Sequence, residues 1–160
     1  MFHQQKNIGR EKGLEKLMRF CAYQERTQWE VRQKIKSLGL SGKDADWIED
    51  YLIEEKFFDD QRFAQAYVRG KFNQQKWGKI KIKLGLKQKG VASDIAETSL
   101  ATNIDEEQYA QTLLGLLEKK LASLDANEEY LSKKAKLIRF AIGRGFEPSL
   151  IEKCAQQVLS

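Results

Sequence analysis

The apolar positions of the chain follow one pattern three times: an apolar residue, three residues, a second apolar residue, three residues, a glycine and a further apolar residue. Positions i and i+4 lie on one face of an α-helix, and glycine readily takes the left-handed conformation that ends a helix. Each copy therefore predicts a packed helix that ends at its glycine. The copies are Val31/Ile35/Gly39/Leu40, Ile82/Leu86/Gly90/Val91 and Leu137/Ala141/Gly145/Phe146.

A further helix is predicted on each side of every copy. The preceding helices show apolar pairs at i, i+1, i+4 and i+5, as in Phe63 to Val68 and Tyr109 to Leu114, with a weaker match at Leu17 to Ala22. The following helices are expected over residues 44–55, 93–100 and 148–159. Their starts carry helix signals, since Ser93 is a suitable N-cap and Pro148 suits a first turn. Thr27 and Glu30 form the sequence of a capping box that opens the middle helix of the first set.

These nine helices predict an all-α protein of three tandem three-helix units. The expected units are residues 14–58, 59–102 and 103–160, the last with an insertion near 121–130 that forms longer helices or a surface loop. A single unit is too small to be comfortable alone, so neighbouring units are expected to stack. The array should be elongated and curved, right-handed or solenoid-like.

Composition adds mainly exclusions. The 160 residues contain one histidine, two cysteines and one proline, and no Walker A, GxGxxG or GxSxG motif. We therefore expect neither an enzyme nor a cofactor or metal site. The chain starts without the pattern of a signal peptide and has no apolar stretch long enough to span a membrane. A cytoplasmic monomer without membrane contact is expected.

Charge is distributed unevenly along the chain. Residues 61–93 contain nine Lys/Arg and no Asp/Glu, although the whole chain has 28 Lys/Arg and 23 Asp/Glu. An anionic partner facing the middle unit is the functional interpretation, and a solvated lysine face is the alternative. The candidate partner-binding or DNA-binding residues are Arg69, Lys71, Lys76, Lys79, Lys83, Lys87 and Lys89.

The helix expected over residues 77–88 has two apolar edges. Ile82 and Leu86 lie on the core side, whereas Trp77, Ile80 and Leu84 lie on the far side, with a lysine stripe between the edges. The second edge must meet either a neighbouring unit or another molecule, and the sequence leaves both open.

Two other charged regions also leave alternatives open. Residues 44–60 contain eight acidic residues and one lysine. These acidic residues suit helix N-termini and a solvated face, or an acidic surface that orients the protein against a partner. A metal site is the third and least supported alternative. The third unit has a basic run that extends the binding surface or simply covers a helix. It contains Lys133, Lys134, Lys136, Arg139 and Arg144.

Two segments of the chain together resemble the RecX regulatory family of bacteria. The first runs from Thr27 through Asp59-Asp60-Gln61-Arg62-Phe63-Ala64, and the second is Gly78-x3-Ile82-x3-Leu86-x2-Lys89-Gly90-Val91. The resemblance covers residues 14–102 well and 103–160 more loosely. It implies a non-enzymatic modulator of the RecA recombinase, whose tandem units lie in the groove of the RecA filament on DNA and inhibit its ATPase, strand exchange and coprotease activities. The motif positions, mainly structural, are Asp60, Phe63, Ala64, Gly78, Ile82, Leu86 and Gly90.

Two other classes of function compete with this one. A direct DNA-binding protein acting without RecA is compatible with three-helix units, because the last two helices and their turn resemble a helix-turn-helix, although no helix shows residues placed to read bases. A helical enzyme that uses the acidic residues with a metal ranks below both.

Overall fold

The computed structural model describes residues 8–160, and this part of the chain forms nine α-helices and no strand. The all-α prediction is therefore confirmed. The helices are α1 (Arg10–Tyr23), α2 (Gln28–Ser37), α3 (Gly42–Glu54), α4 (Asp60–Asn73), α5 (Lys79–Gln88), α6 (Ser93–Asn103), α7 (Glu106–Ala122), α8 (Tyr130–Gly143) and α9 (Pro148–Leu159).

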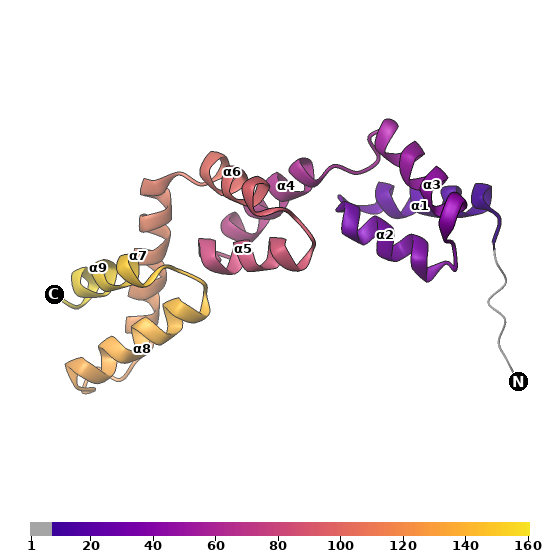
Figure 1. Ribbon diagram of the computed structural model, residues 1–160. Helices are drawn as coiled ribbons and strands as arrows, with labels where there is room; N and C mark the ends of the chain where they lie inside the picture. Colours follow the sequence, from indigo (N-terminus) through magenta and orange to yellow (C-terminus); the bar gives the residue numbers. More distant parts are fainter. Residues whose placement is uncertain (1–7) are drawn as a thin grey trace, which may run out of the picture.

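The helices form three groups of three consecutive helices, arranged as an elongated, bent row (Figure 1). Helices α1–α3 lie at one end, α7–α9 at the other, and α4–α6 between them. The main helix contacts are all made within a group, for example α4 with α6 and α7 with α9. The prediction of tandem three-helix units in an elongated array is confirmed.

The predicted helix ends are confirmed at all three repeated glycines. Gly39, Gly90 and Gly145 have φ angles of 79°, 81° and 92°, in the left-handed region that favours glycine. At the helix starts, Thr27 and Glu30 form the complete capping box of α2, and Pro148 occupies the first turn of α9.

Three predicted helix starts are wrong by one or two residues. The helix expected to begin at Asp44 begins at Gly42. The middle helix of the second unit begins at Lys79 rather than Trp77, because Gly78 takes an extended conformation as its N-cap. The N-cap of α6 is Ala92, so Ser93 is the first helical residue, and its side chain makes no cap hydrogen bond. At α5 the boundary is set by contacts with a distant segment, because the Gly78 N–H donates to the Arg144 carbonyl at 2.7 Å.

The apolar residues form two separate cores in the described part of the chain. The first lies within α1–α3 and includes Leu17, Val31, Ile48 and Leu52, which are fully buried. The second runs continuously through α4–α9, so the middle and last units share one core. Its fully buried side chains include Val68, Ile82, Leu86, Leu113, Leu117 and Leu137.

Residues 121–130 lie between the long helices of the last unit. They comprise the end of α7, the connection and Tyr130, the first residue of α8. Glu128 in this connection accepts hydrogen bonds from Lys136 (2.6 Å) and Ser132 (2.9 Å), and these contacts, that of Lys136 first, lower the pKa of its carboxyl group. Tyr130 and Leu131 at the start of α8 are exposed.

Candidate partner-binding surface

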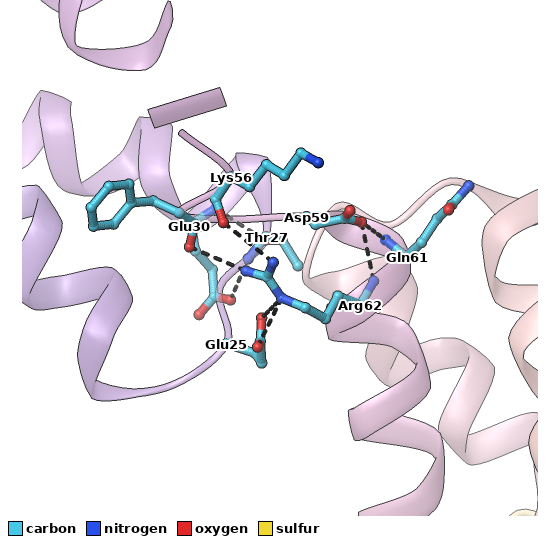
Figure 2. A network of polar contacts seen from close by, with 8 residues as sticks. Glu25, Thr27, Glu30, Lys56, Asp59, Gln61 and Arg62 are labelled. Atoms are coloured by element: carbon cyan, nitrogen blue, oxygen red, sulfur yellow. Dashed lines mark hydrogen bonds and ion pairs between the residues drawn. The ribbon is translucent and has the colours of Figure 1, made fainter. Parts of the chain in front are cut away.

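The first junction, between α1–α3 and α4–α6, is polar. The backbone N–H of Gln28 donates to Asp60 Oδ1 at 2.8 Å, so the second unit caps the start of α2. Figure 2 shows Arg62 reaching back into the first unit, where its Nε lies 2.7 Å from the Glu25 carboxylate. The Arg62 guanidinium also donates to the carbonyl oxygens of Lys56 (3.2 Å) and Phe57 (3.3 Å). Charge-assisted hydrogen bonds therefore hold this junction.

The end of α5 completes the first junction. Gly90 packs against Trp29, and a Cβ at position 90 would overlap the Trp29 side chain. Beside it, Lys89 Nζ lies 3.5 Å from Glu30 Oε2. A positive φ and a close approach thus both require glycine at position 90.

The second junction, between α4–α6 and α7–α9, brings two backbones into direct contact. The N–H groups of Gly78 and Ile80 donate to the carbonyl oxygens of Arg144 (2.7 Å) and Gly145 (3.0 Å). A Cβ on Gly78 would overlap the backbone of Gly145. The loop after α8 therefore caps the start of α5.

Tyr109 of α7 is the central side chain of the second junction. Its ring lies 5.8 Å from the Phe72 ring and 5.1 Å from the Phe146 ring. Its hydroxyl accepts a hydrogen bond from the Lys79 N–H at 2.9 Å and donates one to the Glu147 carboxylate. Burial first, and then the hydrogen bond to Glu147, raise the pKa of the Tyr109 phenol.

Both junctions use the same arrangement at the start of a middle helix. The first helical N–H of α2 is satisfied by Asp60, and that of α5 by Tyr109, each from the following unit. These N–H groups have no partner within their own helix. The other motif positions are Phe63, Ala64, Ile82 and Leu86, which are buried in the core, and Gly78 and Gly90, which lie at the junctions.

Of the three lysines in the predicted stripe on α5, two form ion pairs within the protein. Lys79 pairs with Glu106 and lies 4.6 Å from the centre of the Tyr109 ring. Lys83 pairs with Glu97 of α6, and both of these side chains are exposed. Lys87 is exposed and forms no ion pair with residues 8–160.

The remaining candidate cations have different surroundings. Lys71 Nζ lies 4.6 Å from the centre of the Trp77 ring, and Arg69 donates to Asn103 at 3.2 Å. Lys76 is exposed, has no ion pair in the described part of the chain, and takes a left-handed φ of 56°. With Lys89 paired to Glu30, the most available cations are Lys76 and Lys87.

The second apolar edge of α5 is exposed. Ile80 and Leu84 are 51% and 54% accessible, and they line a groove of about 690 Å³ with Val91 and Ala96. Lys83 and Lys87 flank this groove. Trp77 does not belong to this edge because it precedes α5 and packs partly buried against the shared core.

Comparisons with known proteins decide the family. The chain matches the family model "RecX, second three-helix domain" over residues 59–100 and "RecX, third three-helix domain" over residues 106–154. The chain belongs to the RecX family. Its first unit lies outside both matched ranges, so the assignment rests on the second and third units.

Relatives agree with this assignment. The chain is 35% identical over 139 residues to "Regulatory protein RecX" of Clostridium botulinum, covering 84% of this chain and 63% of that protein. It is 29% identical over 149 residues to the protein of that name from Prosthecochloris aestuarii, covering 93% and 95%. The crystal structure of RecX from Lactobacillus salivarius superposes with a TM-score of 0.83 at 29% identity, covering 93% and 96%. The chain thus spans about 63% of the length of its clostridial relative.

Three of the eight acidic residues between Asp44 and Asp60 of this RecX-family chain, Glu49, Asp59 and Asp60, serve as caps or partners within the protein. Asp59 accepts the N–H groups of Gln61 (2.8 Å) and Arg62 (3.1 Å), and Glu49 accepts from Arg32 (2.8 Å). Among residues 8–160, no three His, Cys, Asp or Glu side chains gather in a way that suits a metal ion. No helix in this range has the length and apolarity required to cross a membrane.

The basic run of the third unit is largely engaged within the protein. Lys134 pairs with Glu152 at 2.7 Å, which raises the pKa of the Lys134 ammonium group, and Lys136 pairs with Glu128. Arg144 donates to the Gln75 carbonyl at 2.9 Å across the second junction. Lys133 donates to the Ala126 carbonyl at 3.1 Å.

The sequence interpretation missed one group of charges in the RecX-family fold. Residues 1–60 contain 11 Lys/Arg and 12 Asp/Glu, a balance that conceals a local basic cluster. Lys16, Arg19, Phe20 and Tyr23 occur at i, i+3, i+4 and i+7, so they share one face of α1. Helical spacing, rather than net charge, was the signal that would have found them.

Proposed function

We propose that this RecX-family chain is a non-enzymatic regulator of the RecA recombinase that binds in the groove of the RecA–DNA filament. There it inhibits the ATPase, strand exchange and coprotease activities of RecA. The observation that carries the proposal is the elongated row of units whose middle member contains the segment 61–93, rich in cations and free of carboxylates. Family membership supplies the partner through the resemblance described above.

The row of units suits attachment at several points along a polymer. Several weak contacts on one connected chain of units raise the overall affinity, because each contact after the first forms at a high effective concentration. The acidic surface of RecA, or DNA phosphate, is the chemistry that the middle unit recognises. The regulator acts as a cytoplasmic monomer.

The surroundings of the lysines rank their contributions. Lys76 and Lys87 are exposed and available, and Lys83 shares an exposed ion pair with Glu97. An exposed pair is worth only about 0–1 kcal/mol, so an anionic partner readily replaces Glu97. Lys79 is largely covered and held against Tyr109, so its contribution is smaller.

The test is the ATPase of RecA on single-stranded DNA in the presence of the protein. Reversing Lys76, Lys83 and Lys87 to glutamate should weaken inhibition at least about tenfold, because three favourable charge contacts become repulsive. The control reverses Lys36, Lys43 and Lys153, which are exposed, lie outside the middle unit and form no ion pair in the described residues. Circular dichroism should show both variants folded.

Three results would count against the proposal. Equal inhibition by the middle-unit variant and the wild type would remove the assignment of the lysines. Equal weakening in both triple variants would indicate a net-charge effect. Salt-sensitive DNA binding with no effect on RecA would favour the alternative, a weakly specific DNA-binding protein that acts without RecA.

A further inference from the structure

The first unit carries a basic groove with aromatic walls, on a different part of the molecule from the middle-unit lysines. Its volume is about 410 Å³, and its lining includes four cations, two aromatic rings and no carboxylate. Leu38 closes the groove at the end of α2. The basic–aromatic groove is formed by Lys16, Arg19, Phe20, Tyr23, Arg26 and Lys34.

The fold of α1 fixes the groove. Lys16, Arg19, Phe20 and Tyr23 share one face of this helix, while Leu17 and Cys21 on the next face are buried in the first core. Burial raises the pKa of the Cys21 thiol from 9.0 to about 11, and the neutral thiol suits this apolar interior. Because the core face anchors α1, the groove side chains have a rigid base.

Cation–aromatic stacking already orders part of the groove. The Arg26 guanidinium carbon lies 3.7 Å from the centre of the Phe20 ring, and Arg26 Nε donates to the Phe20 carbonyl at 2.9 Å. Glu30 Oε2 lies 4.0 Å from Arg26, whose side chain is only 12% exposed. Lys34 Nζ lies 5.6 Å from the centre of the Phe20 ring. Arg26 and Phe20 thus form a fixed stack at the base of the groove.

Tyr23 stands beside this stack and is 82% exposed. The Arg26 guanidinium carbon is 5.9 Å from the centre of its ring, so most of the ring remains open. Lys16 and Arg19 lie on the same helix face, and within residues 8–160 Arg19 pairs with Glu15 alone, in an exposed ion pair at 2.8 Å. An open aromatic ring among cations is the arrangement that binds an unstacked base and its flanking phosphates.

We propose that the basic–aromatic groove binds single-stranded nucleic acid, with a base stacked on Tyr23 and the adjacent phosphates on Lys16, Arg19 and Lys34. In a duplex the bases are stacked on one another, so the ring selects single strands. The proposal goes beyond the regulatory function above, since it concerns another unit and requires no RecA.

The experiment measures binding of a fluorescently labelled oligothymidylate to the full chain at low salt without RecA. Tyr23→Ala should weaken binding about tenfold, whereas Tyr23→Phe keeps the ring and should bind within about twofold of the wild type. Lys16→Glu should weaken binding several-fold by opposing the phosphates. The matched controls are Tyr130→Ala and Lys153→Glu, an exposed tyrosine and an exposed lysine of the third unit.

Loss of oligothymidylate binding in the Tyr23→Ala and Lys16→Glu variants, with both controls unchanged, supports the groove. The proposal is overturned if Tyr23→Ala binds like the wild type or no more weakly than Tyr130→Ala. It is also overturned if Tyr23→Ala weakens binding to a duplex of the same length by the same factor as binding to oligothymidylate. That result would indicate phosphate contacts without base stacking. Inhibition of RecA by the middle-unit variants is measured separately, so either proposal can fail while the other stands.

Discussion

The two junctions between units differ in what holds them, although both cap a middle helix from the following unit. The first depends on the half-buried Asp60 cap, the exposed Arg62–Glu25 pair and the packing of Gly90 against Trp29, and no core crosses it within residues 8–160. The second combines backbone hydrogen bonds with Tyr109 and a core shared by α4–α9. Surface ion pairs contribute little to stability and are screened by salt, whereas burial of apolar area is not screened by salt. The first unit should therefore move relative to the other two, which behave as one body.

The largest effect is expected from Gly78→Ala. The new Cβ would overlap the backbone of Gly145, so the second junction must separate, at a cost of about 3 kcal/mol. Urea unfolding followed by circular dichroism measures the loss. Gly115→Ala is the matched control, because a Cβ there meets nothing within 4 Å and should stabilise α7 by roughly 0.5–1 kcal/mol. Equal stability of the two variants would show that the close approach carries no energy.

A smaller effect is expected from Tyr109→Phe. The variant leaves the Lys79 N–H and the Glu147 carboxylate without their shared partner, at a cost of about 1–3 kcal/mol. Tyr130→Phe, on an exposed ring, should change stability by less than about 0.5 kcal/mol.

The pH dependence gives a second measurement on the same pair of proteins. Because the pKa of Tyr109 is raised above its ordinary value of 10.0, the folded state retains the proton longer than the unfolded state. The stabilisation is complete below pH 10 and decreases as pH rises above it. The difference in unfolding free energy between the wild type and Tyr109→Phe, measured at several pH values, isolates this decrease. A difference that stays constant across pH would contradict it.

The smallest effect on stability is expected from Arg62→Ala at the first junction. Its ion pair with Glu25 is exposed, so the unfolding free energy should fall by no more than about 1 kcal/mol. The radius of gyration in solution scattering should nevertheless change, because Arg62 also joins Lys56 and Phe57 to α4. Arg32→Ala, which removes an ion pair within the first unit, should leave the radius unchanged. Identical scattering of both variants would show that Arg62 does not set the junction.

The helix ends were predictable to the extent that their signals are local. The glycines Gly39, Gly90 and Gly145 and the Thr27 capping box act over a few residues, and the structure confirms each of them. The starts of α5 and α6 were misplaced because Gly78 and Ala92 offer no cap hydrogen bond that a sequence pattern can reveal. At Gly78 the decisive contact is with Arg144, far along the chain.

The candidate site was less predictable than the fold. The spacing on α5 correctly identified a lysine stripe and a second apolar edge, but not that Lys79 pairs with Glu106 and Lys83 with Glu97. Those carboxylates come from α7 and α6, outside the carboxylate-free segment that drew attention to the lysines. Segment composition therefore overestimates the free charge on a folded surface.

The sequence by itself determined the three-helix units, their apolar faces and the glycines that end the middle helices, since helical periodicity and backbone conformation are local properties. Only the tertiary structure decided which units share a core, which lysines are already paired, and that Asp60 and Tyr109 cap the helices of the preceding unit. The two capping contacts join residues 32 and 30 positions apart, and their geometry depends on how whole helices dock.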